Sequence, residues 1–192
     1  MVKKNIILGI GITGTLGSGK GTAVGFLKKK GFKHYSVSAF IKEEVRKRGV
    51  PLDLETVTKV ANEIRREHGP AFIVEEIYKL AEKEGGNFVI ESLRNPGEIS
   101  ALKAKGNFHI FAVDASLDKR YDRLQSRKGD LDDLPFEKFR KIEEKQMSST
   151  DPNGQNLSVC MKMADYLFLN NGTIQELEKQ VEAALEKINN GL

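Results

Sequence analysis

The run GTLGSGKGT at Gly14–Thr22 places several glycines around a single lysine, Lys20. Glycines let a backbone curl until its amides point at phosphate oxygens, and the N-terminus of a following helix adds a favourable dipole. The apolar run Ile6–Ile12 precedes this loop, and a helical apolar period follows it. This strand, loop and helix context predicts that the loop holds the phosphates of ATP. We expect nucleotide contacts from Gly14, Leu16, Gly17, Ser18, Gly19, Lys20, Gly21 and Thr22.

The hydroxyl of this loop lies one residue later than usual. A Ser or Thr that binds Mg²⁺ ordinarily follows the lysine directly, but here Gly21 follows and the hydroxyl comes at Thr22. Gly-Lys-Gly-Thr resembles the loop of the nucleoside monophosphate kinases, such as adenylate kinase. Phosphates and water would then hold most of the Mg²⁺, which makes a carboxylate on a neighbouring strand more important. We expect ATP and Mg²⁺ as cofactors, with Thr22 and Glu91 at the metal.

Glu91 follows the apolar run Phe88–Ile90, at the edge where ligands bind in open α/β sheets. The segment ESLRNPGE, which begins at Glu91, resembles the Asp-Gly-x-x-Arg segment of monophosphate kinases, with Glu for Asp and a shorter spacing to Arg94. The resemblance implies that Glu91 orients magnesium-bound water or the acceptor and that Arg94 grips the acceptor phosphate. A surface salt bridge is the alternative for Arg94.

Three arginines, Arg120, Arg123 and Arg127, recur at helical spacings, so that Arg123 and Arg127 share a helix face. Their segment DKRYDRLQSR resembles the arginine-bearing helix that enters the lid of adenylate kinase and dephospho-CoA kinase. By that resemblance Arg123 and Arg127 clamp the moving phosphoryl group. A solvated basic face is the alternative and is equally open for Arg120. The predicted catalytic residues are Lys20, Glu91, Arg94, Arg123 and Arg127.

The expected acceptor site departs from that of adenylate kinase. Its Ser/Thr-x-Gly-Asp segment, with an arginine three residues later, corresponds here to a segment with Ala39 for Asp and Lys42 for Arg. A lysine offers a point charge where arginine offers a bidentate fork, which weakens the expectation of strict AMP recognition. The aspartate that dephospho-CoA kinases carry after the second strand is missing too, and Asp114 is an alternative carboxylate. The predicted acceptor contacts are Ser38, Lys42, Arg65 and Arg94.

The segment Asn170–Thr173 follows the last apolar run. It resembles the loop that cups the adenine base in the same two kinase families, which implies base contacts at Asn171 and Gly172. A helix capped by Thr173 explains much of the segment without a ligand.

Apolar runs of strand length alternate with segments of helical period along the whole chain. This pattern predicts an α/β fold, a five-stranded parallel sheet with helices on both faces. The expected strands are 6–12, 32–37, 88–90, 108–113 and 166–169, and the expected helices are 20–30, 38–48, 54–67, 70–84, 96–105, 116–127 and 173–189. We expect one domain over 1–192 with two insertions, acceptor-binding helices at 38–84 and a polar lid at 128–163 that closes over ATP.

Composition excludes several classes of protein. The 192 residues are 39% hydrophobic and 30% charged and contain one cysteine, which favours a cytoplasmic protein without a membrane span or disulfide. The net charge of +4 is explained by phosphate-handling Lys and Arg, so nucleic acid binding is not expected. The oligomeric state stays open.

Motifs such as IKEEVRKRG, ANEIRREHGP and MADY extend the resemblance over nearly the whole chain. They resemble a group of adenylate-kinase-related P-loop proteins common in archaea. The predicted function is therefore an ATP-dependent kinase that transfers the γ-phosphoryl group to a nucleoside or deoxynucleoside monophosphate, a small-molecule acceptor. Two alternatives stay open, a dephospho-CoA kinase-like enzyme and an ATP-binding switch or assembly factor with slow turnover.

Overall fold

The core of the molecule is a parallel sheet with strand order β2-β3-β1-β4-β5, seen in a computed structural model that describes residues 7–126 and 135–191. The fold prediction is confirmed: five parallel strands with helices on both faces. The strands are β1 (Gly9–Gly14), β2 (Lys33–Ser36), β3 (Phe88–Leu93), β4 (Phe108–Asp114) and β5 (Tyr166–Leu169). The central strands β1, β3 and β4 are the most buried, as their near-continuous apolar runs require.

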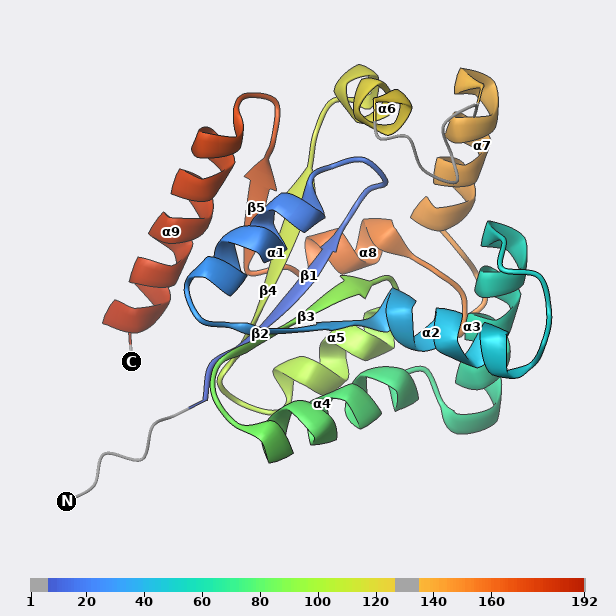
Figure 1. Cartoon of the computed structure of the whole chain (residues 1–192), viewed down its shortest axis with the longest axis horizontal. Helices are drawn as coiled ribbons and strands as arrows, with labels where there is room; N and C mark the ends of the chain where they lie inside the picture. Colours follow the sequence, from blue (N-terminus) through green and yellow to red (C-terminus); the bar gives the residue numbers. More distant parts are fainter. Residues whose placement is uncertain (1–6, 127–134, 192) are drawn as a thin grey trace.

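Two helical layers cover the sheet (Figure 1). On one face α1 (Lys20–Lys29) and α9 (Ile174–Asn190) pack on Ile10, Ile12 and Phe111. On the other face lie α4 (Phe72–Glu84), α5 (Pro96–Lys103) and α8 (Leu157–Lys162), whose apolar side chains meet Ile90 and Ile110. Each layer thus buries one set of alternating strand side chains.

Further helices stand around the carboxyl edge of the sheet. After β2 come α2 (Val37–Lys47) and α3 (Leu54–His68), which with α4 form the predicted helices of 38–84. After β4 comes α6 (Leu117–Gln125), and α7 (Phe136–Met147) stands beside it in Figure 1. This arrangement leaves the loop Gly14–Thr22, called the P-loop below, between two groups of helices.

The expected helices included none in 128–163, but this polar segment contains two, α7 and α8. Helix α7 buries only Phe139 and Gln146. Residues 127–134 lie outside the described part of the chain, and they include Arg127 and the first part of the predicted lid.

Strand β3 runs three residues beyond its predicted end, so that Glu91 lies inside the strand. Ser92 has a φ of 70°, a left-handed conformation that is uncommon for a residue other than glycine. At this residue the register with β1 shifts, since Ile12 pairs with Glu91 but Thr13 pairs with Leu93. Such bulges occur next to active sites, where they redirect side chains.

Candidate functional site

The loop between β1 and α1 depends on glycine at two positions. Gly17 has a φ of 77°, and a Cβ there would collide with the carbonyl oxygen of Arg120. Gly19 has a φ of 101°, and a Cβ there would collide with the Asn170 side chain. Both positions therefore need glycine, for the backbone conformation and for space.

The N-terminus of α1 is open to an anion. Gly19 is the N-cap, it offers no side-chain cap, and the first turn contains no acidic residue. The first amides of a helix lack acceptors within it, and the helix dipole favours negative charge there. Lys20 Nζ donates to the carbonyl oxygens of Gly14 (2.9 Å) and Thr15 (2.6 Å), which folds the ammonium group over the loop.

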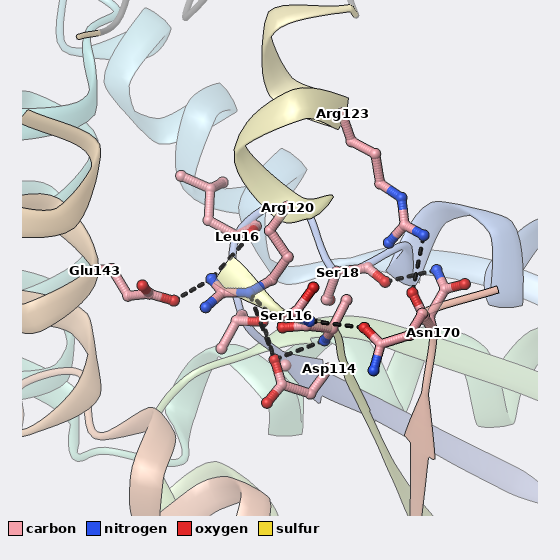
Figure 2. A network of polar contacts seen from close by, with 12 residues as sticks. Leu16, Ser18, Asp114, Ser116, Arg120, Arg123, Glu143 and Asn170 are labelled. Atoms are coloured by element: carbon pink, nitrogen blue, oxygen red, sulfur yellow. Dashed lines mark hydrogen bonds and ion pairs between the residues drawn. The ribbon is translucent and has the colours of Figure 1, made fainter. Parts of the chain in front are cut away.

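A polar network supports the loop from below (Figure 2). Thr15 Oγ1 donates to Asp114 Oδ1 at 2.6 Å, and Arg120 Nε donates to the carbonyl oxygen of Ala115 at 2.8 Å. Arg120 also pairs with Glu143 of α7. The Arg120 side chain is only 8% exposed, so Arg120 ties the loop, β4, α6 and α7 together. Asp114 likewise holds the loop in place.

A second cluster joins the loop to the segment after β5 (Figure 2). Asn170 Nδ2 donates to the carbonyl oxygen of Ser18, and Arg123 Nη2 donates to that of Asn170, both at 2.8 Å. Arg123 Nη1 and Ser18 Oγ are buried and find no hydrogen-bond partner among the described residues. Buried polar groups are ordinarily satisfied, so these two atoms leave hydrogen-bonding capacity beside the loop; Asn107 Oδ1, just before β4, is a third such atom and lies away from it.

The predicted base contacts, Asn171 and Gly172, lie exposed in the turn before α9. Asn171 Oδ1 accepts from the amide of Ser116 at 2.8 Å. Thr173 and Glu176 form a capping box, and a Cβ on Gly172 would collide with Glu176. A cavity of about 360 Å³ opens beside this turn; its lining is Leu169, Asn170, Gly172, Thr173, Glu176, Leu177, Lys179 and Gln180.

Glu91 lies on the α1 face of the sheet between β1 and β2, where His34 Nε2 is 3.7 Å from its Oε1. Burial works to raise the pKa of the Glu91 carboxyl, but the neighbouring polar side chains of His34 and Ser36 and the charge of Lys20 outweigh it and lower that pKa. The carboxylate is therefore ionised at neutral pH.

Arg94 follows β3 beside the start of the P-loop. Thr13 Oγ1 donates to the carbonyl oxygen of Leu93 at 2.8 Å, which fastens the loop's entry to this turn. Burial lowers the pKa of the Arg94 guanidinium, which nevertheless stays charged at neutral pH. Its Nη1 donates to Gln155 Oε1 at 3.3 Å.

The other predicted acceptor contacts lie on α2 and α3. Ser38 and Lys42 are half-buried on α2, directly after β2. Arg65 is 1% exposed, and its Nε and Nη2 donate to Glu98 Oε1 at 3.2 and 2.7 Å. The guanidinium of Arg65 is thus engaged with protein.

The two predicted metal residues come from different elements. Thr22 is half-buried in the first turn of α1, and Glu91 lies in β3. No group of three or more His, Cys, Asp or Glu side chains that could hold a metal gathers within residues 7–126 and 135–191.

Sequence reasoning missed Asn170, Glu98 and Glu143. Glu98 could have been found, because Asn95-Pro-Gly-Glu98 is the pattern of a helix capping box. Asn170 belongs to the segment compared above with a base-binding loop, but its contact with Ser18 was not predicted, and nothing in the sequence marks Glu143; the partners of both residues are distant along the chain.

Comparison with known proteins places this site in a family. An AAA domain model matches residues 10–148, from β1 into the segment after α7. A UPF0200 protein of Pyrococcus horikoshii is 30% identical over 183 residues, which cover 92% of this chain and 95% of the relative. The chain belongs to the AAA domain family and to the UPF0200 proteins. The predicted kinship with P-loop kinase-like proteins is confirmed.

Solved structures share the fold of this UPF0200 protein. Shikimate kinase from Bacteroides thetaiotaomicron superposes with a TM-score of 0.59 at 16% identity and covers 96% of this chain and 99% of that one. Dephospho-CoA kinase from Campylobacter jejuni superposes with a TM-score of 0.51 at 15% identity and covers 94% of this chain and 96% of that one. This chain therefore has the fold of the P-loop kinases. No helix of the described residues is long and apolar enough to cross a bilayer.

Proposed function

We propose that this UPF0200 protein is an ATP-dependent kinase that transfers the γ-phosphoryl group to a nucleoside or deoxynucleoside monophosphate. The observation that carries the proposal is the pair of buried, unpartnered polar atoms beside the P-loop within the described residues, Ser18 Oγ and Arg123 Nη1. A bound nucleotide would supply acceptors or donors for both, and the open N-terminus of α1 would receive its phosphates.

Cations flank the loop on two sides, which is the arrangement that phosphoryl transfer needs. Lys20 lies over the loop, Arg123 reaches it from α6, and Arg94 follows the strand paired with β1. Phosphoryl transfer depends on positioning and on neutralising charge spread over oxygens, so cations that surround the moving group are the catalytic apparatus. Arg94 would bind the phosphate of the acceptor, which favours a monophosphate over a neutral alcohol.

Mg²⁺ fits the same site. Glu91 is ionised and lies near Lys20, and Mg²⁺ commonly takes only one or two carboxylates beside phosphate oxygens and water. When bound, the ion would neutralise phosphate charge. Glu91 would orient its water shell, with Thr22 on α1 as the hydroxyl partner. The turn at Asn171 and Gly172, with the adjoining cavity, would receive the base.

A coupled assay of ADP release tests the proposal, with ATP and a panel of nucleoside and deoxynucleoside monophosphates and dephospho-CoA. We expect a monophosphate to stimulate ADP release, and we expect Lys20→Ala to lower the rate by about 10²–10³-fold. Lys28→Ala, an exposed lysine on the same helix, is the matched control and should keep full activity. Transfer to dephospho-CoA alone would select the first alternative. Tight ATP binding without stimulation by any acceptor would select the switch or assembly factor.

A further inference from the structure

A buried carboxylate, Glu98, the partner of Arg65, lies behind the turn that carries Arg94. It is 0% exposed at the N-terminus of α5. Its Oε2 accepts from the backbone amides of Arg94 at 2.8 Å and Asn95 at 3.0 Å. Its Oε1 accepts from Arg65 Nη2 at 2.7 Å and Nε at 3.2 Å. Four donors thus converge on one carboxylate, which fixes both the turn and helix α3 to α5.

The same turn is held from its other side. Asn95 is 1% exposed, and its Nδ2 donates to the carbonyl oxygens of Pro152 and Gly154, each at 2.8 Å. The amide of Asn156 donates to the carbonyl oxygen of Arg94 at 2.8 Å. The loop before α8 is therefore fastened to the turn, and it brings Gln155 against the Arg94 guanidinium.

A helix cap alone does not require this construction. A capping glutamate satisfies the amide of its N-cap residue and is ordinarily exposed. Here the carboxylate also accepts from the preceding amide, that of Arg94, and from a buried arginine of the acceptor-side insertion. Breaking a buried ion pair is costly, so Arg65 and Glu98 hold α3 to the start of α5.

We propose that Glu98 is a positioning residue for the acceptor site, which holds the backbone of Arg94 in place and ties it through Arg65 to α3; the role in catalysis rests on the proposed kinase function. The Arg94 head is then aimed before the acceptor arrives, and binding needs no reordering of the turn. Arg65, the predicted acceptor contact, acts through Glu98.

The test is a double-mutant cycle on the acceptor KM. In Glu98→Gln one carboxylate oxygen becomes an amide donor that faces N–H groups, so the acceptor KM should rise at least tenfold while the KM for ATP changes less than twofold. In an Arg94→Ala background the same substitution should change the acceptor KM less than twofold, because the group that Glu98 positions is gone. A purely structural role predicts equal effects in both backgrounds, and that result overturns the proposal. Glu63→Gln is the control. Glu63 lies on α3 and pairs with Arg48 near the surface, so its substitution should leave both KM values unchanged.

A second variant and a second measurement cover the other outcomes. If Glu98→Gln does not fold, Arg65→Lys replaces it, since lysine keeps the charge but loses the fork; the acceptor KM should rise severalfold in the wild-type background alone. If no acceptor is phosphorylated by the wild-type protein, the proposed function fails. Hydrogen exchange of the backbone amides then tests whether Glu98 holds the turn at Arg94 and Asn95. The Arg94 and Asn95 amides should exchange as slowly as the Leu93 amide in β3, and exchange at the rate of an unstructured peptide overturns the proposal.

Discussion

The two sides of the P-loop differ in how their polar groups are satisfied. On the nucleotide side, Ser18 Oγ and Arg123 Nη1 are buried without a partner among the described residues. On the acceptor side, Glu98 binds four donors, and Arg65 is 1% exposed and fully engaged. A region with unpaired buried groups is completed by its ligand, whereas a region whose groups pair with one another is built before its ligand arrives. We infer that ATP would order the nucleotide side, whereas the acceptor would meet a surface that is already ordered.

The largest expected effect concerns the stability of the acceptor side. Glu98→Ala should lower the free energy of unfolding by about 3–5 kcal/mol, because it leaves the Arg65 charge buried without its partner. Glu63→Ala removes an exposed pair with Arg48 and should cost only about 0–1 kcal/mol. Urea denaturation of the variants measures both. Equal losses of unfolding free energy in the two variants would contradict the claim that the acceptor side is ordered before its ligand binds.

The next effect concerns catalysis on the nucleotide side. If the protein is the proposed kinase, Arg123→Ala should lower kcat about 10²–10³-fold, because it removes a cation that would neutralise the transferred phosphoryl group. Thermal stability in the absence of nucleotide should fall only modestly, by the loss of the hydrogen bond from Nη2 to the Asn170 carbonyl, since Nη1 has no partner among the described residues. Arg140→Ala, at an exposed arginine of α7, is the control in the same assay. A variant with normal kcat would show that α6 has no catalytic role.

A smaller effect, on the affinity for ATP, is expected at Asn170, which contacts both Ser18 and Arg123. Asn170→Ala leaves the carbonyl oxygen of Ser18 without its donor, which costs about 1–3 kcal/mol, so the Kd for ATP should rise roughly tenfold. Titration calorimetry measures this change, and Asn189→Ala, at an exposed position on α9, serves as the comparison. Unchanged ATP affinity would remove Asn170 from the nucleotide site.

The smallest effect is a pH dependence at Glu91. Its pKa in the folded protein lies below the ordinary value of 4.5, so its stabilising contribution is complete above that value and is lost as pH falls through the folded pKa. The difference in unfolding free energy between the wild type and Glu91→Gln should therefore shrink on acidification. Denaturant titrations from about pH 7 to pH 3 follow it. A difference that grows as pH falls contradicts the sign of the shift.

The sequence predicted the sheet and the P-loop because both leave local signals. Apolar runs mark β1 and β4, and glycines mark the loop that needs left-handed residues. Helix α7 was not predicted although Phe136, Phe139 and Ile142 recur at helical spacing; it packs on a small cluster around Phe139 rather than on the sheet. The roles of Arg65 and Arg120 could not be predicted, because their carboxylate partners lie 33 and 23 residues away. The sequence pattern around an arginine on a polar helix is the same whether the guanidinium binds a phosphate or a buried glutamate.

Hydrogen exchange with and without a non-hydrolysable ATP analogue and Mg²⁺ tests the contrast between the two sides most directly. We predict that the analogue slows exchange in Gly14–Thr22 and around Asn170, where buried polar atoms gain a partner. Residues 94–98 and α3 should be protected already in the free protein and should change little. Fast exchange of residues 94–98 in the free protein, with protection only after the analogue binds, would contradict the account.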